Sequence, residues 1–235
     1  MLTGEIIQNI LSLYEKGAPS DDSRLSPRQI FSRMITIRAK LLVQKSNKRQ
    51  KISQWCYQTI PCLEMIKAQE YDCPCIPSVG CGIYKSKYPL PQPVTGISEH
   101  LLQSVTSLDG TTVYSETTWE EKKFKSGNKY TSKTPDYLLR NNHIILTTDK
   151  LFNKIVSTTG LFNNPIEVWE FENYCEKDCT DCDDCSSYLD REFPLDNDSV
   201  DSLIKLIIEE LLGPFVQMKE DRTSNTADSS DNTSK

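Results

Sequence analysis

Four cysteines in the last third of the chain have the type and spacing of a metal site. They are Cys175, Cys179, Cys182 and Cys185, separated by three, two and two residues. Four thiolates this close can bind one zinc ion in the tetrahedral geometry of structural zinc sites. Five acidic residues between them favour the alternative, an exposed acidic loop whose cysteines stay reduced. The acidic residues are Glu176, Asp178, Asp181, Asp183 and Asp184. Both interpretations stay open, and we assign no metal ion and no cofactor.

The other reactive side chains form no recognisable catalytic set. The two histidines, His100 and His143, lie in no Ser-His-Asp or Cys-His context, and His143 is expected to be structural. No glycine-rich phosphate loop and no HExxH motif are present. A second cysteine group, Cys73, Cys75 and Cys81, lacks a fourth ligand. We assign no catalytic residue and expect that the protein is not an enzyme.

The cysteine count and the apolar pattern indicate the compartment. The chain has nine cysteines, and polar residues interrupt its N-terminal apolar stretch, unlike a signal peptide. Without secretion, an odd count favours free thiols or a metal over a disulfide framework. No apolar run approaches the roughly 20 residues that span a bilayer. We therefore expect a soluble protein without membrane contact, made in a cytoplasm-like interior.

The elements that position these groups begin with residues 26–55, predicted to form a long basic helix or a helix broken near Ser46. Ser26, Pro27 and Gln29 make a start signal of cap, proline and capping-box partner. Ile30, Met34, Ile37 and Leu41 form an apolar stripe along it. Nine basic residues lie in this segment or just before it, although the net charge of the chain is −6. These are Arg24, Arg28, Arg33, Arg38, Lys40, Lys45, Lys48, Arg49 and Lys51.

The basic side chains have three interpretations. They are a solvated face, a surface that neutralises nucleic-acid phosphates, or a surface that meets an acidic patch on another subunit. Base-reading and stacking motifs are absent, so we expect no sequence-specific recognition of nucleic acid. The wide apolar faces of the three main helices favour the third interpretation, with incidental DNA contact as an addition. We expect the partner interface at Arg28, Arg33, Arg38 and Lys45.

The remaining segments predict an α+β chain. A helix over 4–16 would form an N-terminal hairpin with the long basic helix, and an apolar helix over 200–212 follows a cap at 198–199. Short strands are expected at 62–66, 103–108, 112–117, 138–140, 143–146 and 152–159, with turns at Asp109-Gly110 and Asn141-Asn142. A short helix is expected over 165–173, and 120–133 is expected to be a projecting charged loop. The strands indicate a small antiparallel sheet or half-sandwich, with long extended loops.

These elements divide the chain into six predicted regions. They are an N-terminal helical region (1–58), a proline-rich extended loop (59–98), a β-rich region with a short helix (99–174), a cysteine-rich acidic loop (175–198), a C-terminal helix (199–215) and a disordered tail (216–235).

Several runs of residues resemble a known family. They are residues 26–30, 38–48, 58–64, 138–144, 160–168, 193–195 and 210–212. In this order they resemble head-to-tail connector proteins (neck ring or adaptor proteins) of crAss-like short-tailed bacteriophages. The resemblance implies a virion structural protein that joins the portal vertex to the tail. Its implied partners are about twelve copies of itself, the portal protein and other neck or tail proteins, first in the host cytoplasm during assembly and then in the virion.

One alternative function remains open at this point. A zinc-containing, nonspecific nucleic-acid-binding module would use the four clustered cysteines and the basic helix together. Metal analysis and salt-dependent DNA binding distinguish it from a ring protein, because phosphate contacts weaken steeply with salt.

Overall fold

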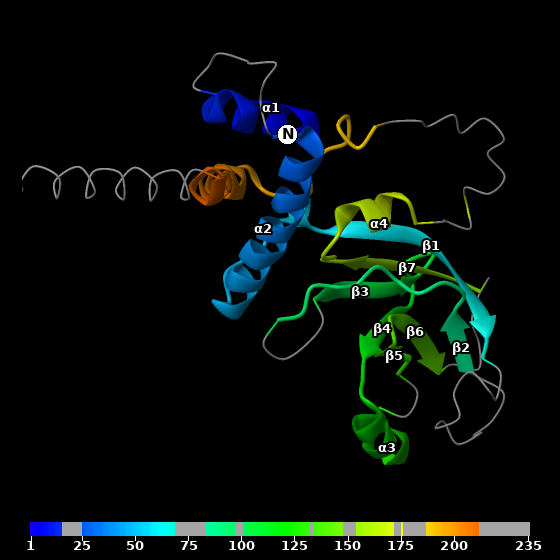
Figure 1. Cartoon of the computed structure of the whole chain (residues 1–235). Helices are drawn as coiled ribbons and strands as arrows, with labels where there is room; N and C mark the ends of the chain where they lie inside the picture. Colours follow the sequence, from blue (N-terminus) through cyan, green and yellow to red (C-terminus); the bar gives the residue numbers. More distant parts are fainter. Residues whose placement is uncertain are drawn as a thin grey trace, which may run out of the picture. The chain divides into compact units, whose positions relative to one another are not determined.

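The computed structural model describes residues 1–15, 25–68, 83–96, 101–131, 134–147, 154–171, 175 and 187–211. The chain divides into two compact units, whose elements are labelled in Figure 1. Residues Met1–Leu41 and Ser186–Lys235 form the helical unit, and residues Leu42–Cys185 form the barrel unit. Within the described ranges, no helix has the length and apolar character needed to cross a membrane.

The described residues of the helical unit form three helices. They are α1 (Thr3–Tyr14), α2 (Pro27–Asn47), which continues past Leu41 into the barrel unit, and a helix of residues 197–211, here called the C-terminal helix and coloured orange in Figure 1. Apolar side chains of all three are buried, as predicted for Ile30, Met34 and Ile37 of the α2 stripe, whereas Leu41 is only partly buried. The most buried are Ile6, Ile10, Ile30, Met34, Ile37, Leu203 and Ile207.

The start of α1 is held by a segment far away in the sequence. The backbone N–H of Thr3 donates to the carbonyl of Arg191 at 2.9 Å, and that of Gly4 donates to Leu189 at 2.8 Å. The N–H of Leu2 donates to the Glu5 carboxylate at 3.0 Å. These bonds satisfy amides that a helix leaves unpaired at its first turn. The helical unit therefore depends on segments from both parts of the chain that build it.

The start signal predicted for α2 is confirmed. The Gln29 amide donates to Ser26 Oγ at 3.3 Å, and the Ser26 amide donates to Gln29 Oε1 at 3.2 Å. The helix ends at Asn47, as expected for a break near Ser46, and Arg49 has a φ of 54°. A 3-10 helix, η1 (Gln54–Cys56), follows instead of a continuous helix to residue 55.

The barrel unit is a closed barrel of seven short strands, so the predicted small sheet or half-sandwich is wrong. The strands are β1 (Gln58–Lys67), β2 (Ile83–Ser86), β3 (Leu102–Ser107), β4 (Val113–Glu116), β5 (Asp136–Arg140), β6 (His143–Thr147) and β7 (Ile155–Gly160). Around the barrel they follow the order β1-β2-β6-β5-β4-β3-β7. Closure arises because β7 pairs with both β1 and β3, and β2 joins β1 to β6. Such long-range pairings leave no periodic signal within a short strand.

A helix occupies the segment that was expected to be a projecting charged loop. β4 and β5 are parallel, with Ser115 opposite Asp136, and a parallel pair needs a crossover connection. That connection contains α3 (Trp119–Gly127). Thr118 and Glu121 cap it reciprocally, since the Glu121 amide donates to Thr118 Oγ1 and the Thr118 amide donates to the Glu121 carboxylate. The loop prediction was wrong because this capping box was not recognised.

A proline lies inside β1 without breaking the barrel. The register between β1 and β7 shifts between Ile60 and Leu63, where β1 has one residue more than its partner. Pro61 sits in this bulge, where its missing N–H removes no ladder hydrogen bond. The expected strand over 62–66 is therefore the second half of a longer one.

The interior of the barrel is one apolar cluster. Its members come from all strands except β2, and three lie outside the strands, at residues 90, 162 and 168. They are Ile60, Leu63, Met65, Leu90, Val105, Tyr114, Tyr137, Ile144, Leu146, Val156, Phe162 and Val168. One short helix, α4 (Pro165–Trp169), ends earlier than the predicted 173, and its expected cap is confirmed by the Ile166 amide, which donates to Asn164 Oδ1 at 3.1 Å.

Both predicted hairpins are confirmed. Gly110 has a φ of 69° in the turn between β3 and β4. Asn141 and Asn142 have φ values of 51° and 60° between β5 and β6, as a type I′ turn requires.

This turn supports a stability prediction. Replacing Asn142 by Gly keeps the positive φ without steric cost, so we expect equal or higher stability. Replacing Asn142 by Val forces a β-branched residue into the left-handed region and should lower the free energy of unfolding by about 1 to 2 kcal/mol. Urea unfolding followed by circular dichroism measures both. Equal stability of the two variants would contradict the turn assignment.

Candidate subunit interface

The part of α2 that belongs to the helical unit presents a basic face to solvent. Arg28, Arg33 and Lys40 are exposed, and they are called the basic face from here on. No acidic residue lies between residues 22 and 64 to neutralise them from the same helix. Lys40 Nζ lies 3.9 Å from the Glu210 carboxylate of the C-terminal helix. A surface of this charge favours an acidic partner.

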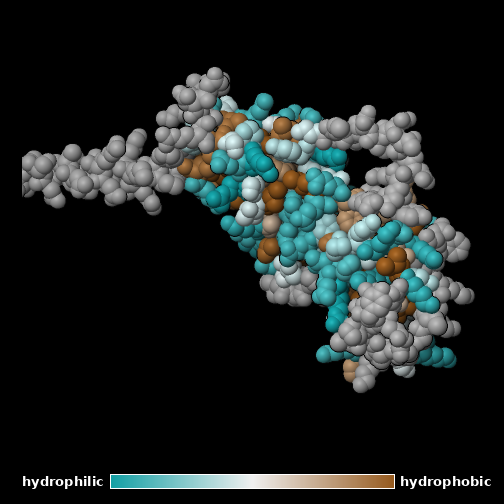
Figure 2. Space-filling view, turned by 45° about the vertical axis from the view of Figure 1, so that its right-hand side comes forward, coloured by the Kyte–Doolittle hydropathy of each residue, from teal (hydrophilic) through white to brown (hydrophobic). Residues whose placement is uncertain are grey.

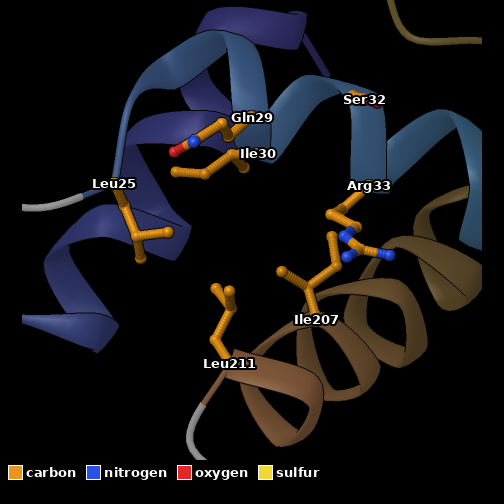
Figure 3. A pocket seen from close by; sticks show the side chains of 7 residues that line it. All are labelled: Leu25, Gln29, Ile30, Ser32, Arg33, Ile207 and Leu211. Atoms are coloured by element: carbon orange, nitrogen blue, oxygen red, sulfur yellow. The ribbon is translucent and has the colours of Figure 1, made fainter.

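A groove opens beside this face, between α2 and the C-terminal helix (Figure 3). Its volume is about 470 Å³, and Leu25, Gln29, Ile30, Ser32, Arg33, Ile207 and Leu211 line it. Figure 3 shows the Arg33 side chain at one side and the apolar side chains of Ile207 and Leu211 on the facing helix. Such a groove fits an apolar side chain accompanied by a carboxylate.

The surface around the helical unit is mixed in polarity. Figure 2 shows hydrophobic residues at the surface beside strongly hydrophilic ones. Leu13 and Leu206 are 57% and 39% exposed, on α1 and the C-terminal helix respectively. In the barrel unit Phe124 and Tyr130, on α3 and just after it, are 78% and 86% exposed. Large apolar side chains in solvent are typical of surfaces that contact other chains.

The four residues predicted at the interface lie in different places. Arg28 and Arg33 are exposed on α2, and Arg33 also lines the groove. Arg38 has no exposed surface, and its Nε donates to the carbonyl of Pro194 at 2.8 Å. Lys45 is partly exposed, in the part of α2 that belongs to the barrel unit. Of the four, only Arg28 and Arg33 are exposed side chains of α2 within the helical unit. Five residues apart, they lie about 140° apart around the helix, with the groove residues Gln29 and Ser32 between them.

A signal for the burial of Arg38 was present in the sequence. It follows Ile30 and Met34 at intervals of four residues, so it lies on the apolar stripe of the helix. The charge of Arg38 led to its prediction as an interface residue, whereas its spacing indicated that the side chain is buried.

Two cysteines form a disulfide, contrary to the expectation of free thiols or a metal. Cys62 of β1 and Cys175 are bonded, with Cα atoms 5.8 Å apart, and Cys56 is buried and free. The bond removes Cys175 from the hypothetical zinc site, which weakens the alternative of a zinc module. The remaining cysteines of both groups, and also His100, lie outside the described residues.

The shifted pKa values in the barrel unit have structural causes. Burial raises the pKa of Tyr57 and of Tyr114, and burial lowers the pKa of Lys122. A hydrogen bond from Ser107 lowers the pKa of Asp109 in the β3–β4 turn. His143 Nδ1 lies 2.9 Å from the Ser86 carbonyl oxygen, which is a structural contact between β6 and β2. These groups belong to separate elements and to no common reactive centre.

The burial of Arg38 predicts a clear difference between the arginines of α2. Arg38→Ala should lower the free energy of unfolding by about 2 to 4 kcal/mol, because it leaves the buried Pro194 carbonyl without this donor and opens a cavity. Arg28→Ala and Arg33→Ala should change it by less than about 0.5 kcal/mol, since both are exposed. Urea unfolding of the three variants measures the difference. An Arg38 variant as stable as the other two would contradict an internal role.

The disulfide predicts redox-dependent stability. A bond between residues 113 positions apart restrains the unfolded chain by about 4 to 5 kcal/mol in the loop-entropy account. Cys62→Ser/Cys175→Ser should therefore be less stable than the wild type under oxidising conditions and equal to it in dithiothreitol. Peptide mapping of the unreduced chain should show the Cys62–Cys175 peptide pair. A wild type with the same stability in both conditions would contradict the bond.

Comparison with known proteins gives one match. The model of a family described as phage tail ring protein 2, from crAss-like phages, matches residues 5–232. No curated protein matches the chain.

Proposed function

Because the chain belongs to the phage tail ring protein 2 family, we propose that its copies form a ring in the head-to-tail connector, where the ring joins the portal vertex to the tail. A structural role in a ring of the phage tail follows from the family itself. The match over residues 5–232 is the observation that carries the proposal, because it includes both units.

The geometry of the helical unit supports assembly from many copies. It exposes a basic face and an apolar groove side by side on one small unit. In a cyclic ring every copy repeats the same contact, so contacts of moderate strength add up around the circle. The exposed aromatic side chains Phe124 and Tyr130 of the barrel unit supply a further surface for neck or tail proteins.

The finer features of the proposal come from the resemblance to connector proteins. The ring has twelve copies, which matches the portal, and it binds the portal protein and other neck or tail proteins. DNA passing through it makes at most incidental contact with the basic side chains, because no stacking or base-reading motif accompanies them. The chain acts as a structural component, not as an enzyme, in the host cytoplasm during assembly and then in the virion.

Mass photometry and negative-stain imaging of the purified chain, with and without portal protein, test this function. A ring of about twelve copies, alone or on the portal, is the expected result. A chain that stays monomeric and does not bind the portal would overturn the proposal.

Charge reversal on the basic face tests the surface used. Arg28→Glu/Arg33→Glu should abolish ring or portal assembly and leave the circular dichroism spectrum and unfolding midpoint unchanged, since both side chains are exposed. Lys67→Glu/Arg140→Glu, exposed positions of the barrel unit, is the matched control for net charge. Normal assembly of the first variant would show that the basic face is only solvated.

A further inference from the structure

A ring joined head to tail needs two different surfaces on every copy. One surface of a copy meets the other surface of the next copy, and the rotation between them closes the circle. The basic face with its groove supplies one such surface. The complementary surface must be acidic, and it must carry an apolar group that fits the groove.

The C-terminal helix provides that chemistry. Its exposed carboxylates include Asp198, Asp201 and Glu209, which are called the acidic face. The exposed cation Lys205 lies among them, four residues from both Asp201 and Glu209, so three carboxylates and one ammonium group make up this side of the helix. With a step of 100° per residue, the three carboxylates fall within about 80° of the helix circumference. They lie opposite the buried side of the helix, where Leu203 and Ile207 are almost fully covered. The acidic face is therefore directed to solvent.

An exposed apolar side chain borders the acidic face. Leu206 is 39% exposed and lies about 60° further round the helix than Glu209. The groove of a neighbouring copy has an apolar lining from Leu25, Ile30 and Leu211, with Arg33 at its side. Leu206 thus matches the apolar lining of the groove, and Glu209 matches the charge of Arg33.

The same helices already pair charges within one chain. Lys40 of α2 and Glu210 of the C-terminal helix lie 3.9 Å apart, with both side chains largely in solvent. Glu210 lies on a different side of its helix from the acidic face, so this pair leaves Asp201 and Glu209 directed outward. Arg28 and Arg33 remain exposed on α2 in the same way.

We propose that Arg28 and Arg33 of one copy dock against the acidic face of the C-terminal helix of the next copy, with Leu206 of that copy in the groove. The inference rests on the proposed ring function and names the partner of its basic face. Opposite charge fixes the direction of the contact, because basic-to-basic and acidic-to-acidic pairings repel.

A charge-swap experiment with the full chain tests the contact. Variant one is Arg28→Glu/Arg33→Glu, and variant two is Asp201→Lys/Glu209→Lys. Asp198 is left in place because it stabilises the first turn of its helix. Each variant alone places like charges at every contact, so each should lose the ring. Mixed in equal amounts, they offer opposite charges at every contact and should restore rings in which the two variants alternate.

Native mass spectrometry of the mixture measures the outcome. The expected rings contain equal numbers of both variants, and an even copy number such as twelve allows strict alternation. If the wild type forms rings but the mixture of variants stays unassembled, this inference is overturned and the ring function is unaffected. A wild-type chain that forms no ring, alone or with portal, would overturn the ring function and this inference with it.

The apolar part of the contact has its own matched control. Leu206→Asp should abolish the ring, because it places a carboxylate at the apolar lining of the groove. Leu13→Asp changes another exposed leucine of the same unit, on α1 and 57% exposed, and should leave the ring intact. Unchanged assembly of the Leu206 variant would remove this side chain from the proposed contact.

Discussion

A closed barrel of seven strands cannot alternate strand direction all the way round. An odd ring of strands must contain an odd number of parallel neighbours, and this barrel has one such pair, β4 and β5. The parallel pair requires the long connection that contains α3, and closure requires β7 to lie between β1 and β3. Closure leaves none of the seven described strands with a free edge, which disfavours joining copies by adding strands to the barrel. We therefore expect contacts between copies to use side chains, as the helical unit offers them.

Local features of the fold were predictable from the sequence because local chemistry determines them. The capping box at Ser26 and Gln29 and the turn at Asn141 and Asn142 each need only a few neighbouring residues. Barrel closure was not predictable, because it depends on pairings between distant short strands. Gly160 illustrates this, since a Cβ there would lie 2.6 Å from Leu102 Cδ2, a contact that exists only once β3 and β7 are paired. The disulfide between Cys62 and Cys175 has the same long-range origin.

The candidate site likewise has features that local sequence predicts and features that depend on distant contacts. The sequence identified α2 as the basic helix, and two of its arginines, Arg28 and Arg33, are exposed, with Arg33 lining the groove. Sequence reasoning predicted Arg38 to be exposed, because a charged side chain is expected in solvent unless a buried partner is known. The partner of Arg38 is the carbonyl of Pro194, which lies 156 positions away in the chain. The groove itself was invisible to sequence reasoning, since it needs the C-terminal helix to lie opposite α2.

The helical unit is assembled from two separate parts of the chain, Met1–Leu41 and Ser186–Lys235. During synthesis the whole barrel segment is translated before the second part of the helical unit. Until then, α1 and α2 lack the C-terminal helix as a packing partner. The amides of Thr3 and Gly4 reach their acceptors at Arg191 and Leu189 only after the barrel segment has been translated. The groove of the proposed contact between copies likewise needs α2 and the C-terminal helix together, so it forms after the barrel segment has been made. In the proposed ring, this order of translation keeps nascent chains on neighbouring ribosomes from joining before their barrels are made.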